Sequence, residues 1–80
     1  MRLTLLSRAY CHLCDEMRQA LQPLLAAHAV ALDVIDVDAH GDLEARWGDK
    51  IPVLLAGTRE LCHYRLDCGA VTAWLAGVSG

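Results

Sequence analysis

Runs of apolar residues in the first part of the chain predict a strand followed by a helix. Residues 2–7 form a short apolar run with partial alternation, which is typical of a buried strand that ends at Ser7. From Cys14 onward, positions recur at the spacing of an amphipathic helix. These positions are Met17, Leu21, Leu24, Leu25 and His28. We expect Pro23 to kink this helix or to end it at Gln22, because proline has no backbone N–H to donate.

The next stretch predicts a second strand and a short helix. Residues 30–38 are rich in β-branched side chains and favour a second buried strand. A strand, a helix and another strand in this order form a unit whose two strands are normally parallel. A short helix is expected over 42–47, with Leu43 and Trp47 facing the core and Gly48 ending it.

The last part of the chain predicts two strands and a closing helix. Residues 51–57 and 58–66 favour strands joined by a tight turn at Gly57, so a hairpin is the economical arrangement. Asp67 is a good N-cap for the last helix. The apolar stripe of that helix consists of Val71, Trp74, Leu75 and Val78. The sequence therefore predicts one α/β domain over 1–80 with the order strand, helix, strand, helix, strand, strand, helix.

Composition and charge exclude several classes of partner. The 80 residues are 55% apolar and 21% charged, without an apolar run long enough to span a membrane. The formal net charge is -3 and the seven lysines and arginines are scattered singly, which argues against nucleic-acid binding. The apolar run at the N-terminus is too short for a signal peptide, so we expect a cytoplasmic protein. Cytoplasmic thiols are kept reduced, so the four cysteines are poor candidates for a structural disulfide framework.

Two cysteines, Cys11 and Cys14, stand where the first strand gives way to the first helix. This context puts Cys11 at or just before the first helical turn and Cys14 one turn inside the helix. Unpaired backbone N–H groups and the positive end of the helix dipole favour the charged form of a thiol at that place. We therefore predict that Cys11 is the nucleophile and that Cys14 resolves a mixed disulfide. His12 either stabilises the Cys11 thiolate when protonated or is a solvated spacer.

The other two cysteines, Cys62 and Cys68, leave further interpretations open. One is a zinc or other metal site that joins Cys62 or Cys68 to Cys11 and Cys14, although the spacing is unusual for zinc. We prefer to interpret Cys62 and Cys68 as small buried hydrophobic residues. Cys68 follows Asp67 at the start of a helix, so an exposed Cys68 would suit a regulatory role. Another alternative is a non-catalytic binding module with the same fold.

Three features together resemble the short, single-domain glutaredoxin-like proteins of the thioredoxin fold. They are Cys-His-Leu-Cys at 11–14 after a strand, Ile51 and Pro52 before the third strand, and Asp67 at the start of the last helix. The resemblance spans essentially the whole chain and implies a mixed four-stranded sheet with strand order 2-1-3-4. It also implies a cis-proline, Pro52, facing the dithiol, whereas local sequence alone favours trans because about 5% of X–Pro bonds in folded proteins are cis. A cis bond would turn the Ile51 backbone outward to pair with an extended substrate chain.

The resemblance also implies residues that bind substrate. Arg8 stands where glutaredoxins often carry a basic residue that meets the glycine carboxylate of glutathione, and Tyr10 directly precedes the nucleophile. Lys50 replaces the threonine of the family's Thr-Val-Pro segment and is expected to meet a carboxylate, while Asp67 is expected to meet the amine. Residues 65–66 are Arg-Leu where glutaredoxins have a glycine pair. The glutathione contacts of the family are therefore only partly retained.

These observations predict a thiol-disulfide oxidoreductase that reduces protein or small-molecule disulfides. We expect a monomer that needs no metal or bound cofactor and acts on a disulfide-containing protein. Its electrons are expected to come from a thioredoxin reductase-type enzyme or from glutathione as a co-substrate. Because the glutathione contacts are incomplete, we expect the dithiol route to be favoured.

Overall fold

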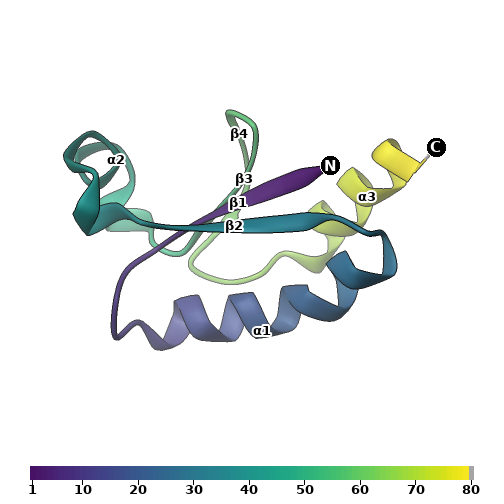
Figure 1. Ribbon diagram of the computed structural model, residues 1–80, viewed down its shortest axis with the longest axis horizontal. Coiled ribbons are helices and arrows are strands. Elements are labelled where there is room, and N and C mark those ends of the chain that lie inside the picture. Colours follow the sequence, from purple (N-terminus) through teal and green to yellow (C-terminus); the bar gives the residue numbers. More distant parts are fainter. Residues whose placement is uncertain (80) are drawn as a thin grey trace.

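The computed structural model describes residues 1–79, with side chains described through residue 77. The strands are β1 (Arg2–Ser7), β2 (Ala31–Asp36), β3 (Val53–Ala56) and β4 (Arg59–His63). The helices are α1 (His12–Ala27), α2 (Gly41–Trp47) and α3 (Cys68–Ser79), and two short 3-10 segments, η1 (Val37–Ala39) and η2 (Gly48–Lys50), flank α2 (Figure 1). The predicted order of strands and helices is confirmed.

The strands form one mixed sheet in the order β2-β1-β3-β4. Strand β1 runs parallel to β2 and antiparallel to β3, and β3 forms an antiparallel hairpin with β4. Gly57 has a φ of 64° in the turn of this hairpin, a left-handed conformation that glycine adopts without steric cost. The strand order and the hairpin are both as predicted.

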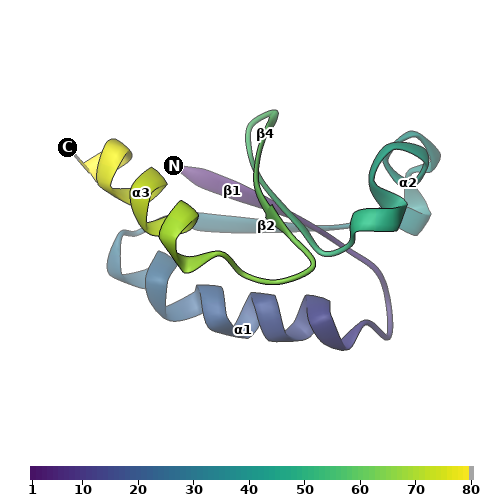
Figure 2. The ribbon, with the colours of Figure 1, turned by 180° about the vertical axis from the view of Figure 1, so that it is seen from behind.

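Several connecting segments leave the sheet at the same end. Leu6 of β1 pairs with Ile35 of β2 and with Val53 at the start of β3, and Val53 pairs with His63 at the close of β4. The segments that follow β1, β2 and β4 and the segment that precedes β3 therefore meet at one end of the sheet, which we call the α2 end. Figures 1 and 2 show α2 and the first turns of α1 at this end, with α3 and the N-terminus at the other.

The main core lies where α1 and α3 pack on one face of the sheet. Its buried members are Leu3, Leu5, Met17, Leu21, Leu25, Val30, Leu54, Cys62, Val71 and Leu75. A smaller buried cluster consists of Leu6, Val37, Val53 and Leu55, with Leu43 and Trp47 of α2 packed against it. Successive side chains of a strand point to opposite faces, so Leu5 and Leu6 contribute to different clusters. Val78, predicted for the stripe of α3, lies outside the described side chains.

Of the two outcomes expected of Pro23, a kink or an end of the helix at Gln22, the second is wrong. The helix continues through Pro23 to Ala27. Pro23 cannot donate to the carbonyl of Gln19, but both residues are exposed, so water can bond that carbonyl instead. His28, predicted on the apolar stripe, is the exposed C-cap of the helix.

The prediction of a buried strand over 30–38 is also wrong in its burial and in its end. Strand β2 is an edge strand that ends at Asp36 and has no buried residue, and Val34 is 49% exposed. An Asp36 carboxylate oxygen accepts the Asp38 N–H at 2.9 Å, which begins η1 in place of further strand. β-Branched residues favour a strand but do not say which neighbours cover it.

Candidate active site

The loop between β1 and α1 places Cys11 at the start of the helix. Tyr10 has a φ of 59° and its side chain is fully exposed, and the chain then enters α1 with Cys11 as the N-cap. The Cys11 sulfur accepts the backbone N–H of Cys14 at 3.2 Å, and the Cys11 carbonyl accepts the N–H of Asp15 at 3.2 Å. A sulfur thus fills the capping position that a serine or aspartate oxygen commonly takes. The first helical turn therefore fixes both thiols relative to each other.

Burial separates the two thiols. Cys11 is partly exposed, whereas Cys14 is only 3% exposed. Burial raises the pKa of Cys14 from 9.0 to about 12, and the side-chain hydrogen bond with Cys11 is the second largest cause of this rise. A hydrogen bond with the Arg8 backbone acts in the opposite direction and lowers the pKa of Cys14. At neutral pH Cys14 therefore keeps its proton and can donate it toward the Cys11 sulfur. Cys11 is the accessible member of the pair.

The peptide bond between Ile51 and Pro52 is cis. Pro52 directly precedes β3, and Val53 pairs with Leu6 near the close of β1, so this bond lies at the α2 end of the sheet with the dithiol loop. Tyr64 holds the segment: its N–H donates to the Pro52 carbonyl at 2.9 Å and its hydroxyl donates to the Asp49 carbonyl at 2.6 Å. Tyr64 was not among the predicted site residues, because these bonds join segments distant in sequence.

A small cleft lies beside the dithiol helix. The chain after Tyr64 passes along the first turns of α1, and Leu13, Glu16, Tyr64 and Arg65 are among the residues that line a cleft of about 180 Å³. Leu13 stands between the two cysteines in sequence, so one wall of this cleft belongs to the helix that carries the dithiol. It offers a mostly apolar surface with one acidic and one basic side chain at its rim.

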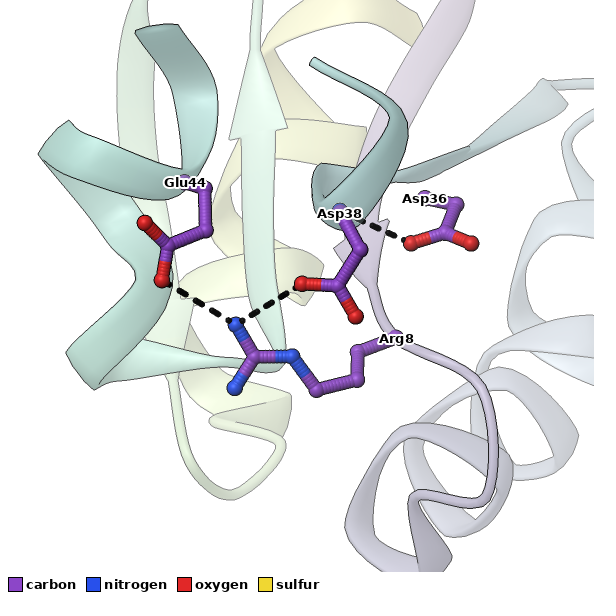
Figure 3. Close-up of polar contacts among 4 residues, drawn as sticks. All are labelled: Arg8, Asp36, Asp38 and Glu44. Atoms are coloured by element: carbon purple, nitrogen blue, oxygen red, sulfur yellow. Dashed lines mark hydrogen bonds and ion pairs between the residues drawn. The ribbon is translucent and has the colours of Figure 1, made fainter. Parts of the chain in front are cut away.

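Arg8 is engaged within the protein. Its guanidinium Nη2 lies 3.3 Å from Asp38 Oδ1 and 3.5 Å from Glu44 Oε1, while its Nε is buried without a hydrogen-bond partner (Figure 3). This Arg8 clamp ties the β1–α1 loop to η1 and α2. Asp38 and Glu44 were not among the predicted site residues. Arg8 follows β1 and Asp38 follows β2, and these two strands are parallel neighbours. Because neighbouring parallel strands end at the same edge of a sheet, the sequence could have indicated that Arg8 and Asp38 lie close together.

The remaining predicted binding residues are spread around the site. His12 is exposed at the first position of α1, and Lys50 is exposed with its Nζ 5.6 Å from the centroid of the Trp47 ring. Ile51 is partly buried against the smaller core cluster. An Asp67 carboxylate oxygen accepts the N–H of Ala70 at 3.0 Å, so the predicted N-cap of α3 is in place.

The two other cysteines differ from each other. Cys62 is buried on β4, as predicted, and burial raises the pKa of its thiol. Cys68 is exposed, so its interpretation as a buried hydrophobic residue is wrong. It is the first residue of α3, where the helix begins at the surface. Within residues 1–79, the histidines, cysteines and carboxylates do not form a group of three or more arranged to hold a metal ion, so the zinc alternative lacks a ligand set there.

The segments that build the site account for the whole formal net charge of the protein. Residues 8–18 and 36–50 carry seven acidic and four basic side chains, while the rest of the chain carries three of each. Both segments belong to the α2 end (Figures 1 and 2). The dithiol therefore lies at an acidic end of an otherwise balanced molecule.

Comparison with known proteins fits this geometry. Residues 2–76 match the family model described as Glutaredoxin-like domain (DUF836). The chain belongs to the glutaredoxin-like family. Its thioredoxin-like fold agrees with this membership, and the family supports a redox role for the fold. A search of curated proteins finds no match. Within the described residues, the helices are too short or too polar to cross a membrane.

Solved structures of similar proteins cover most of the glutaredoxin-like chain. Protein Ne2328 from Nitrosomonas europaea is 37% identical, with 91% of this chain and 88% of that one covered and a TM-score of 0.83. Protein XcR50 from X. campestris is 38% identical over 94% and 96% of the two chains, with a TM-score of 0.68. The glutaredoxin-like protein NrdH-redoxin from Escherichia coli is 25% identical over 81% and 86%, with a TM-score of 0.59, and is described as having a thioredoxin-like activity profile.

Proposed function

We propose that this glutaredoxin-like protein is a thiol-disulfide oxidoreductase in which Cys11 attacks and Cys14 resolves. One observation carries the proposal: an accessible sulfur at the N-cap of α1 is contacted by the backbone N–H of a buried, protonated cysteine. A nucleophile needs access to the substrate, and a resolving thiol needs proximity and protection from outside reagents. Cys11 and Cys14 meet these two requirements separately.

The reaction conserves atoms and electrons in two exchanges. The Cys11 thiolate attacks one sulfur of a substrate disulfide, the substrate S–S bond breaks, and the departing thiolate takes a proton from solvent. Cys14 then loses its proton and attacks Cys11 in the mixed disulfide, which releases the second substrate thiol. The substrate disulfide is reduced and the Cys11–Cys14 pair is oxidised to a disulfide. A reductant must restore the dithiol before the next turnover.

The substrate we propose is a disulfide on a protein. The cleft lined by Leu13, Tyr64 and Arg65 gives a mostly apolar contact surface along the first turns of α1, the helix that Cys11 caps. The segment around Ile51 lies at the same end of the sheet and supplies backbone groups to an extended chain. A protein segment that places its disulfide at Cys11 is long enough to contact both surfaces.

The reductant we propose is a thioredoxin reductase-type enzyme rather than glutathione. Arg8 is the basic residue that the family would direct at a glutathione carboxylate, and here its guanidinium lies within 3.5 Å of Asp38 and Glu44. Asp67, proposed for the glutathione amine, caps α3. A tripeptide anion would have to displace carboxylates that already lie against Arg8. The thioredoxin-like activity profile described for NrdH-redoxin favours the same reductant.

The first prediction is that insulin is reduced with thioredoxin reductase and NADPH as the electron source and much more slowly with glutathione and glutathione reductase. Cys14→Ser should accumulate a mixed disulfide with the substrate, because attack proceeds and resolution does not. The matched control Cys11→Ser should accumulate little. If the wild-type protein turns over with neither reductant yet binds oxidised substrate, the non-catalytic binding module is correct and the enzyme is not.

A further inference from the structure

The second pair of cysteines repeats an arrangement found in the dithiol. In each pair, one sulfur-bearing residue is at the start of a helix and accessible, and the other is buried on the core side. Cys11 and Cys68 are the accessible residues, at the beginnings of α1 and α3. Cys14 and Cys62 are the buried ones, with 3% and 8% exposure. The proposed function uses only the first pair.

Cys62 and Cys68 border the same cavity. The segment from Glu60 to Cys68 folds around an open hollow that is lined by both cysteines together with His63, Arg65 and Asp67, among others. The sulfur of Cys62 is hydrogen-bonded to the backbone of Asp67, the residue directly before Cys68. A buried sulfur thus lies against the peptide unit next to an exposed one. A small disulfide can enter the open hollow and reach Cys68 first.

The first turn of α3 fixes Cys68 in this position. The Asp67 side chain accepts the N–H of Ala70 at 3.0 Å, and the Asp67 carbonyl accepts the N–H of Val71 at 3.1 Å. On the other side, β4 pairs Cys62 with Leu54. The two cysteines are therefore held on two anchored elements, β4 and α3, which are joined by the four residues 64–67. A disulfide requires Cα atoms about 4.4–6.8 Å apart, so Cys62 and Cys68 must come within this range when the bond closes.

We propose that Cys62 and Cys68 form a second, exchangeable disulfide, closed through Cys68 by a low-molecular-weight disulfide. Cys68 attacks the small disulfide, one S–S bond breaks, and a first small thiol leaves with the proton of Cys68. Cys62 then attacks Cys68 in the mixed disulfide and releases the second small thiol with its own proton. The small disulfide is reduced to two thiols and the Cys62–Cys68 pair is oxidised, so the exchange needs no other oxidant.

Trypsin digestion separates the relevant cysteines. Cleavage after Arg59 and Arg65 leaves Cys62 in peptide 60–65 and Cys68 in peptide 66–80, while Cys11 and Cys14 remain together in peptide 9–18. A Cys11→Ser/Cys14→Ser variant, in which only the second pair is left, is incubated with oxidised glutathione and digested without reductant. We expect peptides 60–65 and 66–80 joined, with a mass about 2 Da below the sum of the free peptides because two thiol hydrogens are lost.

Matched single variants test the order of attack. Cys62→Ala in the same background should stop at a stable glutathione adduct on Cys68, and Cys68→Ser should leave Cys62 unmodified because it is buried. A stable glutathione adduct on Cys68 with Cys62 still free in the parent variant would overturn the proposal, as would two free thiols. Wild-type protein digested in the same way provides a check that does not depend on any substitution. The outcome is independent of the function proposed for Cys11 and Cys14.

Discussion

Burial divides the four cysteines into two accessible and two protected thiols. Cys11 and Cys68 are open to solvent, whereas Cys14 and Cys62 are buried and have pKa values raised by that burial. A raised pKa keeps a thiol protonated, and a protonated, buried thiol is a poor target for reagents from solution. The division follows position in the fold, since each accessible cysteine begins a helix and each protected one faces the core.

Selective alkylation tests this division directly. With a small excess of iodoacetamide at mildly acidic pH, we expect Cys11 and Cys68 to be modified well before Cys14 and Cys62. Peptide mapping with fragmentation of peptide 9–18 assigns each site, and denatured protein serves as the control in which all four react. Equal modification of Cys11 and Cys14 would contradict the assignment of Cys11 as nucleophile.

Alkaline pH should destabilise the reduced protein partly through Cys14. The folded protein holds the Cys14 proton to a higher pH than the unfolded chain, with pKa values of about 12 and 9.0. The unfolded state therefore loses this proton first, so the contribution to stability is present below pH 9 and decreases as the pH rises toward about 12. Urea unfolding under reductant should show a steeper alkaline loss for the wild type than for Cys14→Ala. Parallel curves would show that Cys14 does not contribute.

Local spacing was sufficient to predict the dithiol, but not the environment of the other candidate residues. Cys11 and Cys14 were placed correctly at the start of α1 because a strand and an amphipathic stripe bracket them. The exposure of Cys68 was not predictable, because burial at a helix start depends on what packs there. The roles assigned to Arg8 and Lys50 in substrate binding stay predictions.

Among the secondary-structure elements, the short helix α2 has no buried residue of its own and receives polar contacts from outside its own sequence. Arg8 reaches it and η1 across the α2 end of the sheet. A short helix is marginal in isolation, so tertiary contacts must supply much of its stability. The Arg8 clamp and the packing of Leu43 and Trp47 are such contacts.

Replacing Arg8 should loosen α2 without unfolding the protein. Arg8→Gln leaves Asp38 and Glu44 without their shared cation, and partly exposed ion pairs contribute about 0.2–1 kcal/mol each. We expect a loss of about 1 kcal/mol in unfolding free energy and faster amide exchange in α2. The control Arg8→Lys should retain more of the stability. Unchanged exchange in α2 together with a raised KM for glutathione would instead assign Arg8 to substrate binding.

Sequence patterns predicted the elements better than the contacts between them. The periods of α1 and α3 and the hairpin turn at Gly57 are local, and all three were predicted. The bonds from Tyr64 to Asp49 and Pro52 bring together segments more than ten residues apart, and no local pattern encodes them. The edge position of β2 likewise depends on which strands pair with β1, and the β-branched residues of β2 do not specify this pairing. The strand order 2-1-3-4 was predicted from the family resemblance.

At the scale of the whole molecule, charge is distributed unevenly between the α2 end, which holds the dithiol, and the opposite end, which holds α3. The segments at the α2 end account for the formal charge of -3, and the remainder is balanced. Such a distribution produces a field that attracts cations toward the acidic end and repels anions. Substrates that bear positive charge near their disulfide should therefore meet Cys11 more often than neutral or anionic ones.

The salt dependence of disulfide exchange measures this effect. The rate at which Cys11 reacts with cystamine, a cationic disulfide, should fall as salt is added, because a Debye length of about 10 Å at 0.1 M screens the acidic end. The rate with neutral hydroxyethyl disulfide should stay constant and serves as the control. Identical salt dependence for the two reagents would show that the charge distribution has no influence on the reaction.

The edge position of β2 has a consequence for the behaviour of the protein at high concentration. An edge strand presents unpaired backbone N–H and C=O groups that can template the addition of a strand from another molecule. Asp33, which pairs with Arg2 at 3.0 Å, and Asp36 are spaced along β2. A second copy added in parallel register would bring identical carboxylates together, so these charges oppose self-association. Loss of these charges would remove this protection and leave the sheet open to ordered aggregation.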